Sequence, residues 1–488
     1  MSAIMSNEEE SSKNELKIPR RTLIKAAGAT SAVLGLSGLG VSGYQAGKAP
    51  NSYTGCESFQ GSAQSFDRKR FAVDKPHYEK VGPTSRPDGR TEVLFSRLGV
   101  AMSAARSDKK IEDLDEPYRS YYLSRPEDFE LDKKNRELMH KVAEDSTENK
   151  NRYLLAEAWA DAMGTVSPKS IGNKPPEVSD FPKDRFGNPL KMKSPEATAR
   201  LIKKVSYEFG TVLVGITKLN PDWVYKYPSG RRGFDRNKPI EVPKHWQYAI
   251  VVGAPMSWDP MYANPNFGTS NDAYSKSRIV AFRLASFIKR LGYAARPHTP
   301  GNSYDVMVPP IMVDAGLGEQ GRHSVVITPE LGCNFRPAVI TTNLPMKTDK
   351  PISFGVQDFC KNCKICAEQC PSGAITTGGK ENIRGYKRYL LHSSKCFNFW
   401  NSKHGSMGCR ICIAACPYTR KSNWVHKTAL KITANDPTTI SHKVLTSMQK
   451  RFYPGQNPSD YYAATLGGKN ASYREPPWWL KTEDFIEL

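Results

Sequence analysis

The sequence predicts a fold of the α/β (α+β) class joined to a small cysteine-rich module. Helical stretches alternate with short strand-like runs between residues 194 and 350, which favours a mixed sheet covered by helices. Eight of the ten cysteines lie between residues 360 and 416, in two closely spaced runs. At 488 residues the chain is too long for one ordinary hydrophobic core, so we expect two or three packed units.

The first segment, residues 1–49, has the order of a twin-arginine signal peptide. A polar stretch ends in Arg20 and Arg21, and a mildly apolar run from Ala26 to Gly43 follows. Because Gly, Ala, Ser and Thr dilute this run, a permanent membrane anchor is disfavoured. The alternative is a chance basic pair ahead of an ordinary amphipathic helix. We expect export of the folded chain, with cleavage between residues 46 and 49.

The chain is strongly basic, with a formal net charge of +21. A nucleic-acid partner is disfavoured because the charges are scattered and an exported protein would not meet one. An anionic membrane surface or an acidic electron donor is favoured, and a plain solvated basic surface is the alternative. The oligomeric state cannot be read from the sequence.

The α/β core is expected at residues 194–350, after a polar region, 50–193, that packs on it. Ser194 as N-cap and Pro195 in the first turn open a helix that ends at Gly210. Strand-like runs follow at 212–216, 248–252 and 325–328.

A second helix is expected between the last two of these strands. Its apolar residues keep helical spacing, with Asn271 or Asp272 as the cap and Gly292 as the stop. The cysteine-rich module follows at 351–430. The tail, 431–488, is too rich in aromatic residues to be floppy, so we expect it to pack back on the core.

The two cysteine runs have the spacing of bacterial ferredoxins. They read Cys360-x2-Cys363-x2-Cys366-x3-Cys370-Pro371 and Cys396-x12-Cys409-x2-Cys412-x3-Cys416-Pro417. In ferredoxins the fourth cysteine of each run ligates the other cluster, which predicts a ferredoxin-like module with two [4Fe–4S] clusters. Cluster 1 would take Cys360, Cys363, Cys366 and Cys416, and cluster 2 would take Cys370, Cys396, Cys409 and Cys412.

One alternative remains for the cysteines of the two runs. Structural zinc sites use the same soft ligands, but zinc knuckles lack the x3-Cys-Pro ending. The two remaining cysteines, Cys56 and Cys333, are interpreted as buried spectators rather than ligands.

Other cofactor motifs are absent from the sequence. We find no Gly-x-Gly-x-x-Gly, no Gly-Lys-Ser/Thr phosphate loop and no Cys-x-x-Cys-His haem site, which disfavours nicotinamide, Rossmann-bound flavin, nucleoside triphosphate and c-type haem. The Asp-x-His-x-x-Gly motif that gives cobalamin a lower histidine is also missing. A cluster pair only moves electrons, so the core should hold a second redox centre or a substrate site.

Nearly the whole chain resembles the respiratory reductive dehalogenases. The resemblance lies in the twin-arginine segment, the two cysteine runs and several short stretches, namely Gly316 to Arg322, Thr328-Pro329, Arg336-Pro337, Tyr274-Ser275 and Pro476-Pro477-Trp478-Trp479. It implies a nitroreductase-like core that binds cobalamin without a lower ligand from the protein. It also implies a peripheral location on the outer face of the cytoplasmic membrane, with a small anchor protein and an upstream electron donor.

The resemblance further implies a terminal reductase of organohalide respiration. Electrons would pass from an outer to an inner cluster and on to cobalamin, and a carbon–halogen bond of a small organohalide would be cleaved at Co(I). Tyr274 would donate a proton to the carbon, with Arg322 beside it stabilising the phenolate and Asn302 as a hydrogen-bond donor. Without the resemblance, these would be ordinary residues of a core, a loop and a turn.

Two other functions fit some of these features. An epoxyqueuosine-reductase-like enzyme would use the same cofactors on a tRNA base, but that work is cytoplasmic and conflicts with a twin-arginine signal. A non-catalytic iron–sulfur electron-transfer subunit would not need some 300 residues of core sequence ahead of its clusters.

Overall fold

The computed structural model describes residues 67–144, 189–229, 237–261, 266–300, 304–420, 424–436 and 438–452. The twin-arginine segment, Cys56, Asn302 and the Pro-Pro-Trp-Trp stretch lie outside the described residues. In the described part of the chain, no helix combines the length and the apolar character needed to span a membrane.

The core is built on a four-stranded sheet. Its strands are β2 (Leu213–Lys218), β3 (Tyr248–Pro255), β4 (Ala295–His298) and β7 (Phe335–Thr342), in the order β2-β3-β7-β4. Every neighbouring pair is antiparallel, so the expectation of a mixed sheet was wrong. The reason is β7, which lies between β3 and β4 and runs opposite to both. Strands β4 and β7 are not predicted from the sequence.

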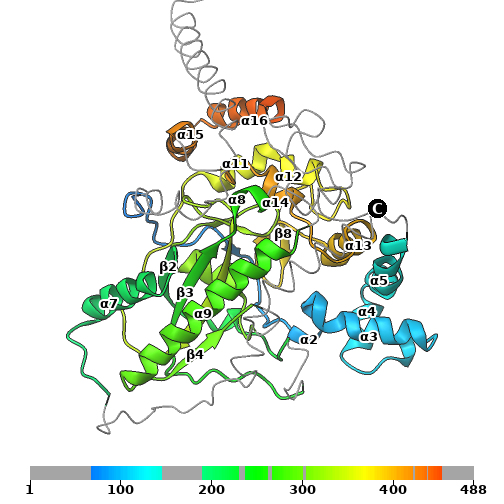
Figure 1. Ribbon diagram of the computed structural model, residues 1–488, viewed down its shortest axis with the longest axis horizontal. Coiled ribbons are helices and arrows are strands. Elements are labelled where there is room, and N and C mark those ends of the chain that lie inside the picture. The colour runs from blue at the N-terminus through cyan, green and yellow to red at the C-terminus, as the bar shows by residue number, and fades with distance from the viewer. Residues whose placement is uncertain are drawn as a thin grey trace, which may run out of the picture.

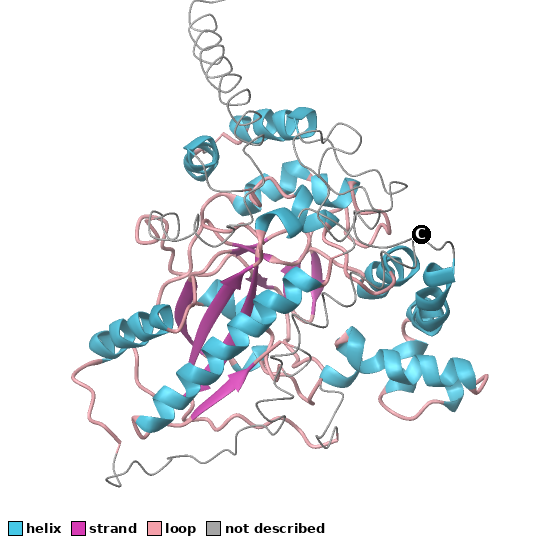
Figure 2. Cartoon of the chain, in the orientation of Figure 1, coloured by secondary structure: helices cyan, strands magenta, loops and turns pink. Residues whose placement is uncertain are grey.

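Helices cover one face of this sheet. Ile250 and Val252 of β3 pack with apolar residues of α7 (Pro195–Glu208) and α9 (Gly268–Arg290) in one buried cluster. The intervening residues Ala249 and Val251 belong to a second cluster on the opposite face, which continues into the cysteine-rich module. This alternation follows from the two-residue period of a strand. Figure 1 shows α9 lying along the sheet, and Figure 2 shows the strands enclosed by helices.

The two predicted core helices form, with one difference in their bounds. Ser194 caps α7, because its side chain accepts a hydrogen bond from the amide of Ala197, as predicted. The second helix, α9, begins at Gly268, earlier than the expected caps Asn271 and Asp272. An earlier asparagine, Asn266, accepts a hydrogen bond from the Thr269 amide at 3.0 Å. It thereby gives a partner to one of the free backbone amides in the first turn of α9.

The described N-terminal helices pack on the cysteine-rich module. The elements before the sheet are β1 (Glu79–Lys80), α2 (Gly89–Glu92), α3 (Leu94–Arg106), η1 (Ile111–Asp113), α4 (Tyr118–Leu123) and α5 (Pro126–Glu144). Helix α5 lies against α3 and against α13 (Ser393–His404), and β1 pairs with β9 (Tyr386–Arg388). The region expected to pack on the core therefore also supports the module (Figure 1).

The remaining elements connect the sheet to the module and form its helices. They are η2 (Pro221–Trp223), α8 (Trp258–Met261), α10 (Val308–Asp314), β5 (Glu319–Gln320), β6 (Val326–Ile327), α11 (Val356–Cys363), α12 (Ile365–Glu368), β8 (Glu381–Ile383), α14 (Ile411–Ala415), α15 (Trp424–Asn435) and α16 (Ile440–Phe452). Helix α16 packs against α11 and α15, so the described part of the tail lies on the module.

Candidate functional site

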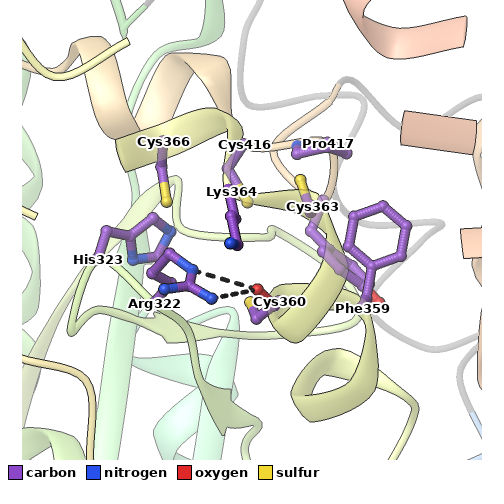
Figure 3. Close-up of a pocket in the computed structure, with 10 residues that line it drawn as sticks. Arg322, His323, Phe359, Cys360, Cys363, Lys364, Cys366, Cys416 and Pro417 are labelled. Carbon is purple, nitrogen blue, oxygen red and sulfur yellow. Dashed lines mark hydrogen bonds between the residues drawn. The ribbon is translucent and has the colours of Figure 1, made fainter. Parts of the chain in front are cut away.

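Four thiols line one cavity between the core and the module. They belong to Cys360, Cys363, Cys366 and Cys416, and Figure 3 shows them around a common space. The first three come from α11 and α12. Lys364, with a φ of 53°, ends α11 and starts α12, and this turn brings Cys366 back toward Cys360 and Cys363. Cys416 belongs to the second run and follows the C-terminal end of α14.

The other four cysteines of the runs form a second group. Cys412 interacts electrostatically with Cys370, Cys396 and Cys409, and Cys409 in turn with Cys396 and Cys370. Cys396 comes from α13, whereas Cys412 comes from α14. Cys370, from the first run, thus lies with cysteines of the second run, and the ligand set of each cluster stays a prediction.

The chemistry of these thiols fits iron–sulfur clusters. Burial raises the pKa of the Cys363, Cys396 and Cys409 thiols to about 12, so each would be neutral at pH 7 without a cation. The described cysteines form no disulfide. One buried set and one partly buried set of four soft ligands match the ligand number of two [4Fe–4S] clusters.

Arg322 lies beside the first thiol cavity and not beside Tyr274. Its guanidinium donates to the carbonyl of Cys360 at 2.9 and 3.2 Å, and to those of Thr376 and Gly378 at 3.0 and 2.7 Å. It also lies over the Tyr389 ring, 4.2 Å from the centroid. The pairing of Arg322 with Tyr274 is therefore corrected, because these four contacts hold the guanidinium on the module. Figure 3 shows the two hydrogen bonds to Cys360.

The guanidinium at Tyr274 is that of Arg336. Tyr274 is half-buried on α9, and Arg336 comes from β7, with its guanidinium carbon 5.2 Å from the centre of the tyrosine ring. Arg336 also donates to the hydroxyl of Ser270 at 2.8 Å. Ser270 lies one helical turn before Tyr274, so α9 presents both residues on one face.

A second arginine links this place to the cysteines. Arg410, which directly follows Cys409, donates to the same Ser270 hydroxyl at 2.7 Å. Burial lowers its pKa to about 9, so it stays positively charged at pH 7. One serine oxygen thus joins Arg336 beside Tyr274 to Arg410 beside the second thiol group.

Two further polar residues surround Tyr274. Arg278, on the next turn of α9, and Tyr304 both interact electrostatically with it. Burial lowers the pKa of Arg278 to about 10. The Nε atoms of Arg278 and Arg336 are buried and have no hydrogen-bond partner among the described residues. The site therefore offers hydrogen-bond donors to a ligand that carries acceptors.

The third predicted residue, Asn302, lies outside the described residues. The residues that flank it are described: Pro300 accepts a hydrogen bond from Arg278, and Tyr304 donates to the carbonyl of Pro337 at 2.9 Å. Its role therefore stays a prediction.

Three residues of this site are not predicted from the sequence: Ser270, Arg336 and Arg410. A signal existed for two of them. Arg410 lies inside the second cysteine run, and Arg336 opens one of the short stretches that carry the family resemblance. Ser270 has no sequence signal, because its role depends on two arginines that are 66 and 140 residues away.

Comparisons with known proteins identify the cysteine-rich module and show what the chain is similar to. The 4Fe-4S dicluster domain matches residues 359–419. The tetrachloroethene reductive dehalogenase of Sulfurospirillum multivorans is 31% identical over 312 residues, which covers 57% of this chain and 58% of the relative. That of Desulfitobacterium hafniense is 29% identical over 293 residues, 50% of this chain and 52% of the relative. The chain thus matches little more than half the length of these relatives.

A solved structure shares the fold. It is a reductive dehalogenase whose structure suggests a mechanism for B12-dependent dehalogenation. It has a TM-score of 0.57 and 22% sequence identity, and the match covers 80% of this chain and 50% of that one. At this identity the likeness concerns the fold alone.

Proposed function

The chain belongs to the reductive dehalogenase family, and on that premise we propose that it removes a halide from a small organohalide by reduction. The reaction replaces a carbon–halogen bond by a carbon–hydrogen bond, takes up two electrons and one proton, and releases one halide ion. The observation that carries the proposal is the continuous contact from Tyr274 through Arg336, Ser270 and Arg410 to Cys409. A proton donor and an electron-carrying module meet there.

The residues fit the cofactors that this reaction needs. The two sets of four cysteines would hold two [4Fe–4S] clusters, which supply single electrons. Cobalamin, the B12 cofactor named for the structural relative, would supply the cobalt centre at which the carbon–halogen bond is reduced. The unpaired Nε donors of Arg278 and Arg336 would be available to hydrogen-bond its peripheral amides.

Tyr274 is proposed as the proton donor. Proton transfer from its hydroxyl leaves a phenolate, and the guanidinium of Arg336 beside the ring stabilises that negative charge. Ser270 holds Arg336 in place by accepting its hydrogen bond. Arg410 adds a second positive charge on the same side, next to the thiol group that contains Cys409.

We also propose where the protein works and what it meets. The twin-arginine segment supports export in the folded state, with a peripheral place on the outer face of the cytoplasmic membrane. A small membrane-anchor protein and an upstream electron donor would be its partners. The net charge of +21 suits an anionic membrane surface or an acidic donor.

The names of the curated relatives suggest chlorinated ethenes as the first substrates to test. The purified, cofactor-loaded protein would be given reduced viologen and a panel of chlorinated ethenes, chlorinated ethanes and halogenated aromatics. We expect halide release from at least one class. If the epoxyqueuosine-reductase alternative is right, modified tRNA will be reduced and no organohalide will react. If the electron-transfer alternative is right, no corrinoid will be bound.

A further inference from the structure

A histidine lies on the wall of the first thiol cavity. His323 belongs to the turn between β5 and β6, which is closed by hydrogen bonds from the Gly321 amide to Val325 and from the Ser324 amide back to Gly321. The side chain is buried and lines the cavity together with Cys360 and Cys416 (Figure 3). The proposed function gives it no role.

Cys333, one of the two cysteines outside the runs, lies at the same place. It is fully buried, and its amide donates to the Thr419 hydroxyl at 3.1 Å. The preceding residue, Gly332, has a φ of 57°, and a Cβ there would lie 2.3 Å from the carbonyl oxygen of Tyr418. Only glycine allows this approach, which sets the Cys333 loop directly on the chain that follows Cys416.

The side chains of His323, Cys333 and Cys416 form a triangle. Their ligand atoms all lie within 4.8 Å of one another, and the Cys333 sulfur is 3.3 Å from Nε2 of His323. The Cys416 sulfur is the third corner of this triangle, so it lies close to both the His323 ring and the Cys333 sulfur.

The direction of these hydrogen bonds follows from the backbone. The amide of Val325, which can only donate, lies 3.2 Å from Nδ1 of His323. Nδ1 must therefore carry the lone pair, and the proton of the neutral ring is on Nε2. Nε2 lies 3.3 Å from the Cys333 sulfur, so His323 is a donor on this side of its ring, and the Cys333 thiol supplies a second proton.

We propose that His323 and Cys333 donate hydrogen bonds to the Cys416 sulfur and thereby raise the reduction potential of cluster 1. The proposal rests on the cluster ligation given above and on nothing else in the proposed function. A reduced cluster carries one more negative charge than an oxidised one, so donors at a ligand sulfur stabilise it more. Two clusters with identical ligand sets would then differ in potential, which gives electron flow between them a direction.

The test is a redox titration of the loaded protein, followed by electron paramagnetic resonance, in wild type, Cys333→Ala, Cys333→Ser and His323→Phe. We expect the midpoint potential of cluster 1 to become more negative in Cys333→Ala and His323→Phe. Cys333→Ser keeps a donor and should stay near wild type. The potential of cluster 2 is the internal control and should not move in any variant.

Two results would overturn the proposal. One is an unchanged potential of cluster 1 in both donor-removing variants. The other is a loss of iron in Cys333→Ala, which would make Cys333 a ligand rather than a hydrogen-bond donor. Because neither result depends on corrinoid or on dehalogenation, they are separate from a failure of the proposed function.

A measurement on wild type covers the case in which the variants do not fold. Protein labelled with ¹⁵N-histidine would be reduced and examined for a nitrogen coupling to the cluster spins. His323 is the histidine on the wall of the first thiol cavity, so a weak coupling assignable to cluster 1 is expected. Its absence would contradict the hydrogen bond.

Discussion

The guanidinium of Arg336 lies against the ring of Tyr274, with 5.2 Å between the guanidinium carbon and the ring centre. This pair replaces the expected pair of Tyr274 and Arg322, and it leads to the first prediction. Tyr274→Phe keeps the ring but removes the proton, so dehalogenation should fall by about 10² to 10⁴-fold while iron and corrinoid contents stay unchanged. Arg336→Met should also lower the rate, because the phenolate loses its positive neighbour.

The control for this prediction is Tyr293→Phe. Tyr293 follows the same helix, but it lies far along the chain from Tyr274, and its hydroxyl donates to the carbonyl of Leu190, an exposed residue. The rate of halide release should match wild type. Full activity of Tyr274→Phe would remove Tyr274 from the reaction.

Arg322 is predicted to matter for cluster loading rather than for proton transfer. Arg322→Lys keeps the positive charge, but its three donor hydrogens on one nitrogen cannot replace the four hydrogen bonds to Cys360, Thr376 and Gly378. We expect the iron content to fall from about eight toward about four per chain, because only cluster 1 adjoins this residue. Iron and sulfide analysis would measure it. Full loading combined with lost activity would speak for the role that the sequence suggested.

Arg97 and Asp132 form a buried ion pair that should stabilise the docking of the N-terminal helices. The Nε of Arg97 donates to Asp132 at 2.9 Å, both side chains are fully buried, and Arg97 also reaches Ser394 on α13 at 2.7 Å. Arg97→Met leaves a buried carboxylate without its partner, which should cost about 3–5 kcal/mol of unfolding free energy in urea.

The exposed pair of Lys387 and Glu79, at 3.2 Å, is the control for that measurement. Lys387→Ala should change the unfolding free energy by less than about 1 kcal/mol. An equal effect of the two substitutions would contradict a special role for the buried pair.

Glu319 makes stability depend on pH. Burial raises its pKa to about 7 from an ordinary value of 4.5, although the amides of Phe354 and Val356 donate to it. The folded state therefore binds more protons than the unfolded state between pH 4.5 and pH 7, so stability falls as pH rises through this window. Glu319→Gln should match wild type at pH 4 and be more stable at pH 8, by up to about 3 kcal/mol.

Urea unfolding at the two pH values would measure this effect. Glu368→Gln is a suitable control, because Glu368 is on the surface and pairs with Lys450. A pH dependence that persists unchanged in Glu319→Gln would show that another group causes it.

Local features of the fold were predictable from the sequence because they depend on neighbouring residues. The cap at Ser194 and the spacing of the cysteines are of this kind. The sheet topology was not predictable in the same way, because β7 pairs with β3 across some 85 residues and no local pattern reports such a pairing.

The candidate site likewise has features that local sequence predicts and features that depend on distant segments. The thiol groups follow from the spacing of the runs, and Tyr274 follows from a family resemblance. The choice between Arg322 and Arg336 depends on which carbonyls and hydroxyls the two guanidiniums meet, and those partners come from distant segments. Cys333 was interpreted as a spectator for the same reason, since its contacts with His323 and Cys416 arise only from the tertiary fold.

The most direct test of the central claim is the ratio of viologen oxidised to chloride released when the cofactor-loaded protein turns over tetrachloroethene under anoxic conditions. Two electrons should be consumed for each chloride, and no chloride should appear from protein that holds its clusters but lacks corrinoid. A fully loaded protein that accepts electrons from viologen yet releases no halide from any substrate of the panel would contradict the assignment as a reductive dehalogenase.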